Sequence, residues 1–298
     1  MTRRIAVTGA SGFIGGHLTS ALIARGDTVT PIRRPFRIAD LSEKLRSVDT
    51  IVHLAGVVSA VHERDFYMAN VDATRAVARA AQAAGARLIH ISSLAAAGPS
   101  PGTAPRSEED SPAPITPYGR SKLEGERCVT ETPDLRWTIL RPGVVYGSGD
   151  RAMRPLFRMA EHRVLPLVGR TSAAYMFIHI DDLLRALISA IDVDHPGDTI
   201  FVGHPSAVTA RELLETIRAV VEPRALIVPV PLALMRLAAA FGDLGGWISG
   251  RPAVINRWRY AELASEGFVC RVDRMRERLH VEPRIGLTEG ITKTARPE

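Results

Sequence analysis

The chain has 298 residues, of which 46% are hydrophobic and 23% are charged, and its formal net charge is +6 at pH 7. This composition is typical of a globular protein with a sizeable core, organised as one large domain or two modest ones. The positive charge comes from an excess of arginine. No run of five basic residues occurs and aromatic residues make up only 5%, so we expect no nucleic-acid partner.

Two features of the sequence bear on the cellular compartment of the protein. The chain contains two cysteines, Cys128 and Cys270, too few for a disulfide framework and without metal-site spacing. They fit a reducing cytoplasm, and we expect no bound metal. The first residues run directly into a strand pattern, so we expect no signal peptide.

The most apolar stretch covers residues 225–248. Prolines and charged residues interrupt it, at Pro229, Pro231, Arg236 and Asp243. We therefore expect no membrane span. A helix over an apolar substrate pocket and a monotopic membrane contact both remain open.

Short apolar runs alternate with helical patterns through the first half of the chain. We expect strands at 4–10, 28–32, 50–56, 87–93 and 136–147. We expect helices at 15–26, 70–85 and 118–131. Continuous apolar strands that alternate with helices predict an α/β fold, a Rossmann-type doubly wound parallel sheet covered on both faces.

The second half is less regular. We expect strands at 175–180 and 199–203 and helices at 181–191 and 209–221, with Thr209 and Glu212 forming a capping box. The proline- and serine-rich segment 99–117 is expected to be a surface loop. We place a domain boundary near residue 148, between a dinucleotide-binding domain (1–148) and a smaller C-terminal α/β substrate region (149–298). The strand and helix near 175–192 are candidates to rejoin the first domain.

A glycine-rich turn follows the first predicted strand. Gly9, Gly12 and Gly15 stand between that strand and a helix, in a G-x-x-G-x-x-G spacing. Glycine there permits a tight turn, a close approach of a pyrophosphate and close packing of helix on strand. We expect a dinucleotide to bind here. The expected contacts are Gly9, Ser11, Gly12, Phe13, Ile14 and Gly15.

The end of the second predicted strand bears on which dinucleotide binds. Enzymes that bind NAD usually carry an acidic residue there, whereas this chain has Arg33 and Arg34. Two guanidinium groups suit a 2′-phosphate, so NADP(H) is favoured and NAD(H) remains possible. Asp40 and Leu41 are expected to flank the adenine.

Tyr118 and Lys122 are four residues apart on a predicted helix and therefore share one face. A neighbouring ammonium group is expected to lower the pKa of the tyrosine towards the range of an acid/base catalyst. Lys122 is one of three lysines in the chain, beside Lys44 and Lys293. A serine at the end of the strand 87–93, Ser93, could polarise a substrate carbonyl.

Seven motifs in order along residues 5 to about 190 resemble the extended short-chain dehydrogenases/reductases of the NAD-dependent epimerase/dehydratase family. They are TGASGFIGGHL, DTIVHLAG, NVDAT, HISSLAAAG, YGRSKLEGE, RPGVVYG and FIHIDDL. The resemblance implies a catalytic triad of Ser93, Tyr118 and Lys122. It also implies a small-molecule substrate and a homodimer formed through helices that flank the sheet.

The same resemblance assigns further residues to the cofactor. Tyr118 and Lys122 are expected to contact it, and so are Leu54, Ala55 and Gly56 on the adenosine side and Pro142, Gly143 and Val144 on the nicotinamide side. Asn70 is implied to tie its helix to the sheet.

The family contains several chemistries. Sugar dehydratases of the family carry an acidic pair after the triad serine or threonine, whereas this chain has Leu94 and Ala95, so dehydration is disfavoured. Ala97 stands where sugar epimerases commonly have a tyrosine. This difference weakens the hypothesis of a nucleotide-sugar substrate. The motif SSLAAAGPSP and the apolar second half are more similar to the branch of 3β-hydroxysteroid dehydrogenase-like and dihydroflavonol reductase-like proteins.

The leading hypothesis is an oxidoreductase that transfers hydride between NADP(H) and a ketone or secondary alcohol. Met235, Leu232 and Phe241 could face a lipophilic ligand or simply pack the core. A nucleotide-sugar epimerase with tightly bound NAD is the alternative; Arg151, Arg154 and Arg158 could then bind a diphosphate. A non-catalytic NADP(H) redox sensor is a second alternative, against which the intact triad argues.

Overall fold

A parallel sheet of six strands forms the centre of the molecule, seen in a computed structural model that describes residues 2–36 and 38–295, with the backbone alone at 38–40 and 42. The strand order is β10-β5-β4-β3-β1-β2, and every pair is parallel. The strands are β1 Arg4–Thr8, β2 Thr28–Ile32, β3 Thr50–His53, β4 Arg87–Ile91, β5 Trp137–Pro142 and β10 Asp198–Val202. The order reverses between β1 and β3, where open sheets bind ligands. The predicted Rossmann-type fold is confirmed.

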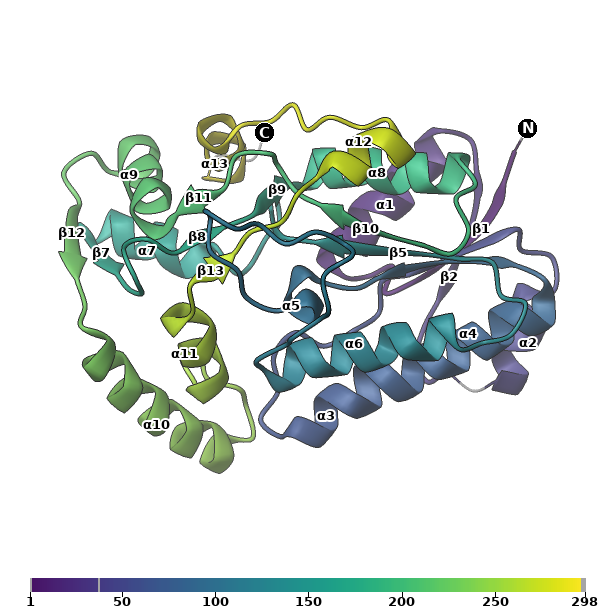
Figure 1. Cartoon of the computed structure of the whole chain (residues 1–298), viewed down its shortest axis with the longest axis horizontal. Helices are drawn as coiled ribbons and strands as arrows, with labels where there is room; N and C mark the ends of the chain where they lie inside the picture. The colour runs from purple at the N-terminus through teal and green to yellow at the C-terminus, as the bar shows by residue number, and fades with distance from the viewer. Residues whose placement is uncertain (1, 37, 296–298) are drawn as a thin grey trace.

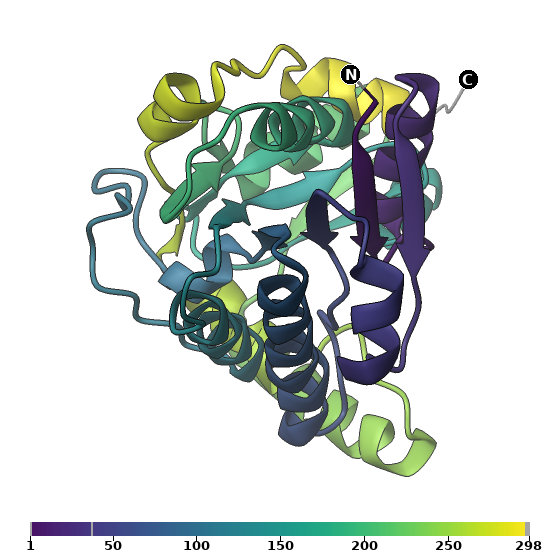
Figure 2. The same ribbon diagram turned by 90° about the vertical axis from the view of Figure 1, so that its right-hand side faces the viewer.

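Helices cover both faces of the sheet, as Figures 1 and 2 show. On one face lie α1 Phe13–Ala24, α8 Ile180–Asp192 and α12 Asp273–Leu279. On the other lie α2 Ile38–Leu45, α4 Ala73–Ala84 and α6 Pro117–Thr130. Two short elements, α3 Glu63–Tyr67 and the π-helix η1 Met68–Asp72, lead into α4.

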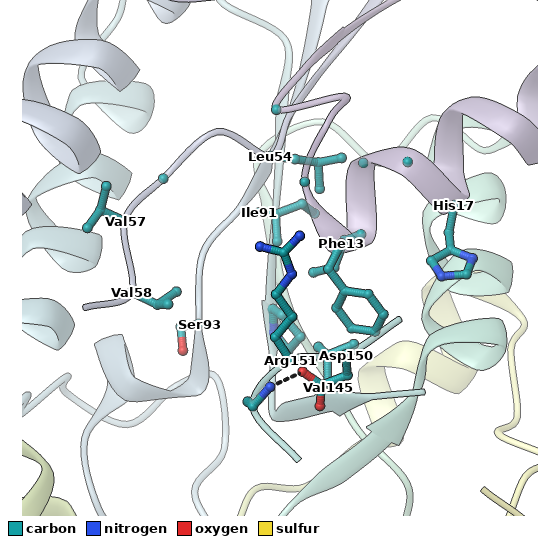
Figure 3. Close-up of a pocket in the computed structure, with 18 of the residues that line it drawn as sticks. Phe13, His17, Leu54, Val57, Val58, Ile91, Ser93, Val145, Asp150 and Arg151 are labelled. Carbon is teal, nitrogen blue, oxygen red and sulfur yellow. Dashed lines mark hydrogen bonds between the residues drawn. The ribbon is translucent and has the colours of Figure 1, made fainter. Parts of the chain in front are cut away.

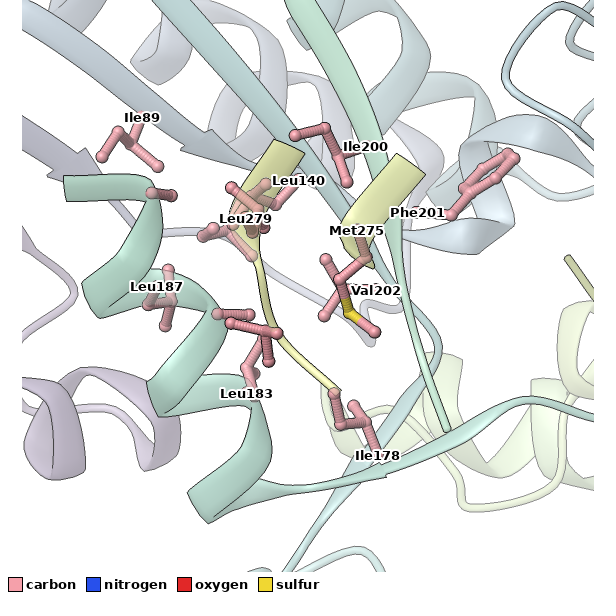
Figure 4. Packing of buried hydrophobic residues seen from close by; sticks show 14 of the residues in the cluster. Ile89, Leu140, Ile178, Leu183, Leu187, Ile200, Phe201, Val202, Met275 and Leu279 are labelled. Carbon is pink, nitrogen blue, oxygen red and sulfur yellow. The ribbon is translucent and has the colours of Figure 1, made fainter. Parts of the chain in front are cut away.

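The larger core cluster joins the first face to the second half of the chain. Figure 4 shows Leu183 and Leu187 of α8 and Leu279 of α12 packed with Leu140 and Ile200 of the sheet. All five side chains are buried. Thus β10 is an edge strand of the large sheet and α8 covers one of its faces, although both follow residue 148 in the chain. The predicted domain boundary near residue 148 stays a proposal.

The segment predicted as one strand at 175–180 is interrupted. It forms β8 Ala174–Tyr175 and β9 Phe177–His179, which join different small sheets. β9 pairs with β6 Val144–Tyr146, and β8 pairs with β11 Val208–Thr209 and β13 Gly267–Phe268. The break at Met176 was not visible in the apolar pattern, because pairing with distant strands decides it.

A second group of elements surrounds its own apolar cluster. It contains α7 Arg154–Glu161, β7 Val164–Leu167, α9 Ala210–Val221, β12 Leu226–Pro229 and α13 Leu287–Ala295. The predicted capping box of α9 is confirmed, since Thr209 and Glu212 each bond the other's backbone N–H. Beyond it project α10 Leu232–Ser249 and α11 Arg257–Ala264, at the lower left of Figure 1.

The remaining predictions concern loops and membranes. After the short helix α5 Leu94–Ala97, the chain to residue 116 forms the predicted loop, and Ser100 ties it to the backbone of Val269. In the described ranges, none of the helices has both the length and the apolar character needed to cross a bilayer.

Helix α1 lies unusually close to the end of β1, and two glycines make this possible. Gly9 has a φ of +69°, which side chains rarely adopt. A Cβ on Gly15 would stand 2.0 Å from the carbonyl oxygen of Gly9. Glycine at 15 is therefore a steric requirement of the turn.

We predict that Gly15→Ala destabilises the fold on the order of 3 kcal/mol, because backbone must move to admit the methyl group. Gly16→Ala is the matched control, since its Cβ would meet only the oxygen of Ala10, at 3.8 Å. Alanine there is expected to be neutral or to stabilise the helix by up to about 1 kcal/mol. Guanidinium denaturation measures both; equal stability of the two variants would contradict the prediction.

Candidate active site

A cavity of about 1100 Å³ opens at the carboxyl ends of the parallel strands. The start of α1, the ends of β3, β4 and β5, helix α6 and the loop 149–152 form its walls (Figure 3). The residues predicted from the sequence that line it are Gly9, Ser11, Gly12, Phe13, Ile14, Gly15, Leu54, Gly56, Ser93, Tyr118, Lys122, Pro142 and Gly143. The fold therefore brings both predicted groups, cofactor contacts and triad, to one cavity.

Other predicted cofactor contacts lie outside the cavity lining. Arg33 and Arg34 are exposed just beyond β2, next to β1 in the sheet. Leu41 belongs to α2, and its side chain is buried in the core. Val144 lies on β6 and does not line the cavity, whereas its neighbour Val145 does. Ala55 is buried, with its N–H donated to the Thr8 hydroxyl. The side chain of Asp40 lies outside the described residues.

The start of α1 has the features of an anion site. Its N-cap is Gly12, so no side chain caps the first-turn N–H groups, and its first turn contains no acidic residue. These N–H groups carry the positive end of the helix dipole and line the cavity. A phosphate-containing group fits this turn, because the uncapped N–H groups can donate to its oxygens.

Tyr118 stands on the first turn of α6, whose N-cap Thr116 accepts a hydrogen bond from the N–H of Gly119. Burial raises the pKa of its phenol to about 12, and a side-chain hydrogen bond with Ser93 opposes this rise. Ser93 caps the short helix α5 and accepts from the N–H of Ala95, so its own O–H remains to be donated. The pair joins the end of β4 to α6.

The sequence led us to expect that Lys122 lowers the pKa of Tyr118. The structure corrects this expectation, because burial raises the pKa of the phenol, Ser93 is the side chain that lowers it, and the charge of Glu262 raises it further. The Lys122 ammonium is itself buried and donates to the carbonyl oxygen of Ile91 at 2.7 Å. Burial lowers its own pKa to about 8.

A buried ionic cluster holds α6 against the sheet. Glu126, one turn after Lys122, receives Nε of Arg141 at 2.9 Å and a second guanidinium nitrogen at 2.5 Å. Ser92 donates to the same carboxylate. Glu126 also raises the pKa of Lys122 and so limits the effect of burial. Glu126 was not predicted from the sequence, although its i+4 spacing from Lys122 was a readable signal.

A second buried chain of hydrogen bonds connects β1 to α6. The Thr8 hydroxyl accepts two backbone N–H groups of residues 54 and 55 and therefore donates to Nδ1 of His53, at 2.7 Å. Nε2 of His53 then donates to Thr74, and Thr74 donates to the carbonyl of Asn70. The Asn70 amide bonds Val57 and Ser121.

Among the cavity residues that were not predicted as cofactor contacts are His17, Asp150 and Arg151. His17 binds the carbonyl of Ser148 at 2.9 Å, and Asp150 accepts from the N–H of Ala152. Burial raises the pKa of the Asp150 carboxyl. Figure 3 shows Arg151 extending into the cavity from its loop. Only the position of His17, one turn after Phe13 in α1, was legible from local spacing.

Metal ligands do not gather here or elsewhere in the described ranges. Across residues 2–36 and 38–295, no group of three His, Cys, Asp or Glu side chains is placed to hold a metal ion. The cavity therefore offers hydroxyl, ammonium and guanidinium groups and free backbone N–H groups.

The chain belongs to the NAD dependent epimerase/dehydratase family, whose model matches residues 5–203. It is 30% identical over 315 residues to a "Ceramide reductase" of Caulobacter vibrioides, covering 97% of this chain and 92% of that protein. It is also 30% identical over 251 residues to a "dTDP-6-deoxy-L-talose 4-dehydrogenase (NAD(P)(+))" of Kitasatospora kifunensis, covering 71% and 77%.

A similar fold occurs in the solved structure "MoeE5 in complex with UDP-glucuronic acid and NAD". The TM-score is 0.80 at 24% identity, covering 98% of this chain and 97% of that one. These findings confirm the resemblance to extended short-chain dehydrogenases/reductases. They also confirm that the chain is an enzyme of the oxidoreductase type.

The buried ammonium of Lys122 makes stability depend on pH. The pKa of Lys122 falls from 10.5 to about 8. Between these values the unfolded chain binds a proton that the folded chain does not, so the free energy of unfolding rises with pH. We expect wild type to gain up to about 3 kcal/mol relative to Lys122→Met across this window.

Denaturation of both proteins at a series of pH values measures this difference. Lys44→Met, which removes an exposed lysine of α2, controls for the loss of a lysine. Parallel curves for wild type and Lys122→Met between pH 8 and 10.5 would disprove a shifted Lys122 pKa.

Proposed function

We propose that this protein is an NADP(H)-dependent reductase that converts a ketone to a secondary alcohol. The observation that carries the proposal is that Ser93 and Tyr118 line the same cavity as the glycine turn, where Ser93 acts to lower the pKa of the Tyr118 phenol. A hydroxyl pair in this position can hold a carbonyl oxygen and deliver a proton to it.

The protonation state of Tyr118 supports reduction as the direction. Burial holds the pKa of the phenol near 12, so Tyr118 is protonated at neutral pH. A neutral phenol is the form that donates a proton to the oxygen of a ketone as the carbon accepts hydride. When bound, NADPH supplies that hydride. Ser93 donates its free O–H to the same oxygen and orients the ketone.

Lys122 contributes to the same site through the charge of its ammonium group. Its ammonium, bonded to Ile91 near the end of β4, places positive charge under the cavity floor. This charge favours the tyrosinate that remains after proton transfer, although burial keeps the pKa of the resting phenol raised. Its compact ammonium also suits a ribose hydroxyl of the cofactor better than the wide fork of an arginine. We therefore assign Lys122 an electrostatic role.

We propose a lipophilic ketone as the substrate class. Apolar side chains line the cavity beside the hydroxyl pair, among them Val57, Val58 and Val145. Val58 is 76% exposed in the wall, which leaves an apolar surface for a hydrocarbon chain. Similarity to a protein named ceramide reductase over 97% of the chain supports the same class.

A nucleotide-sugar substrate is the second candidate, and Arg151 is the observation in its favour. The guanidinium lies in the cavity wall and could bind a diphosphate. Denaturing the purified protein and identifying any released nucleotide separates the two candidates. Stoichiometric NAD⁺ favours an epimerase that keeps its cofactor, whereas an empty protein that binds NADPH reversibly favours the reductase.

Replacement of Tyr118 by phenylalanine tests the mechanism. We expect Tyr118→Phe to lower kcat by roughly 10²-fold or more, because the proton donor is lost, while Kd for NADPH stays within a few-fold. Tyr67→Phe, at a tyrosine outside the cavity, is the matched control. Single-turnover NADPH oxidation with long-chain ketones measures the rate. Full activity of Tyr118→Phe would refute the proposed acid.

The preference for NADP(H) rests on Arg33. This arginine is exposed just beyond β2, and it has no hydrogen bond or ion pair within the described part of the chain. Arg34 contacts the carbonyl of Ala69 at 3.5 Å and the ring of Phe36, so Arg33 is the freer of the two. A 2′-phosphate would supply its partner.

We predict that Arg33→Asp weakens NADPH binding by about tenfold or more and leaves NADH binding unchanged or tighter. Arg46→Asp makes the same charge change at an exposed position away from β2 and controls for net charge. Titration calorimetry with both nucleotides measures the effect. Equal loss of affinity for NADPH and NADH would remove Arg33 from the 2′-phosphate site.

A further inference from the structure

Helix α10 exposes an apolar surface that the proposed reaction does not use. Its large side chains that are more than half exposed are Leu234, Leu237, Phe241, Leu244, Trp247 and Ile248. Isolated exposed apolar residues are ordinary, but a continuous group of this size marks an interaction surface.

The inner side of the helix is already packed. Met235, Ala239 and Gly246 are its buried residues, and α11 is the helix against which it lies. A Cβ on Gly242 would stand 1.9 Å from the carbonyl oxygen of Ile255, so the returning chain presses closely on this side. The exposed surface is therefore a second face of α10, additional to the one that holds it in the fold.

The width of this face distinguishes between kinds of partner. At about 100° per residue, the six large exposed side chains span about 140° of the helix circumference. The exposed small residues Ala233, Ala238, Ala240 and Gly245 extend the apolar face to about half of the circumference. Two charged residues of α10, Arg236 and Asp243, lie at one margin of this face. A helix that pairs with another helix needs only a narrow seam, whereas a helix lying in a lipid surface presents a broad apolar face.

Further exposed apolar residues lie in the segments that precede and follow the helix. Leu226 and Val228 of β12 and Val164 of β7 are exposed next to each other in the two-stranded sheet that precedes α10. Val254, in the turn after α10, is 76% exposed. In Figure 1, β12, α10 and α11 form one edge of the molecule, away from the large sheet.

Arginines outnumber acidic residues in α10 and in the turn that follows it. Arg236 and Arg251 are exposed, and neither forms an ion pair with any described residue. The acidic residue of α10, Asp243, accepts a hydrogen bond from the backbone N–H of Arg257. The guanidinium groups of Arg236 and Arg251 match anionic head groups, and the exposed rings of Phe241 and Trp247 match the interfacial layer of a bilayer.

We propose that the outer face of α10 binds the surface of an anionic lipid bilayer without crossing it. The position of α11 gives this docking a consequence for the cavity. Trp258 of α11 contacts Phe66 with ring centroids 5.4 Å apart, and Phe66 contacts Tyr118 at 6.1 Å. Two aromatic side chains, Trp258 and Phe66, therefore connect α11 to the proposed proton donor.

The test is sedimentation with vesicles of phosphatidylcholine and phosphatidylglycerol, compared with vesicles of phosphatidylcholine alone. Wild type is expected to bind the anionic vesicles and to bind less at high salt. The double variant Phe241→Ser/Trp247→Ser should bind at least about tenfold more weakly, because two aromatic side chains no longer enter the lipid. Ile23→Ser, at an exposed apolar residue of α1, should bind like wild type.

Fluorescence gives a second readout. A blue shift on addition of anionic vesicles should occur in wild type and be absent in Trp247→Phe, whose ring still enters the lipid. If the double serine variant fails to fold, Arg236→Glu/Arg251→Glu replaces it and should abolish the preference for phosphatidylglycerol.

Two outcomes would overturn the proposal. One is a wild-type protein that binds neither vesicle. The other is a wild-type dimer that ignores vesicles and that the double serine variant converts to monomers, since a second copy would then cover α10. Vesicle binding requires no turnover, so the result is independent of the proposed reductase activity.

Discussion

The active-site region depends on the burial of three charged side chains, Lys122, Glu126 and Arg141. Desolvation of such groups is costly, and only close pairing offsets it. Arg141 on β5 bonds both oxygens of Glu126 on α6, which fixes the helix against the sheet. Lys122, one turn earlier, then meets the carbonyl of Ile91 at the end of β4. Tyr118, a further turn earlier, is thereby held at the cavity. The proposed proton donor is thus positioned by charges that lie below it.

The hydrogen-bond chain from Thr8 through His53 and Thr74 to Asn70 supplies the other half of this arrangement. It begins beside Gly9 and ends at the Tyr118 helix, so the turn that would hold phosphates and the residues that would act on substrate are fixed relative to each other. Burial lowers the pKa of His53 to about 3, which keeps its ring neutral and its tautomer constant at working pH. Precise alignment of two bound molecules requires this kind of rigidity.

The sequence predicted what local spacing encodes. Gly9, Gly12 and Gly15 indicated the turn, and the i, i+4 spacing of Tyr118 and Lys122 indicated a shared helix face, because short-range geometry decides both. Contacts between distant segments were not legible. β10 enters the large sheet from far along the chain, and Arg151 reaches the cavity from a loop whose position depends on the second half. The pKa of Tyr118 was misjudged for the same reason, since burial is a property of the whole fold.

The burial of Tyr118 and the exposed apolar face of α10 both suit the lipophilic ketone that we propose as substrate. A phenol with a raised pKa is suited to giving a proton to a ketone, and an apolar surrounding is what raises it. The same surrounding accepts a hydrocarbon chain more readily than a diphosphate. Such a chain is scarce in water and abundant in a bilayer, so an enzyme for it benefits from a surface that rests on lipid. The broad face of α10, with unpaired Arg236 and Arg251 beside it, has the composition that this surface requires.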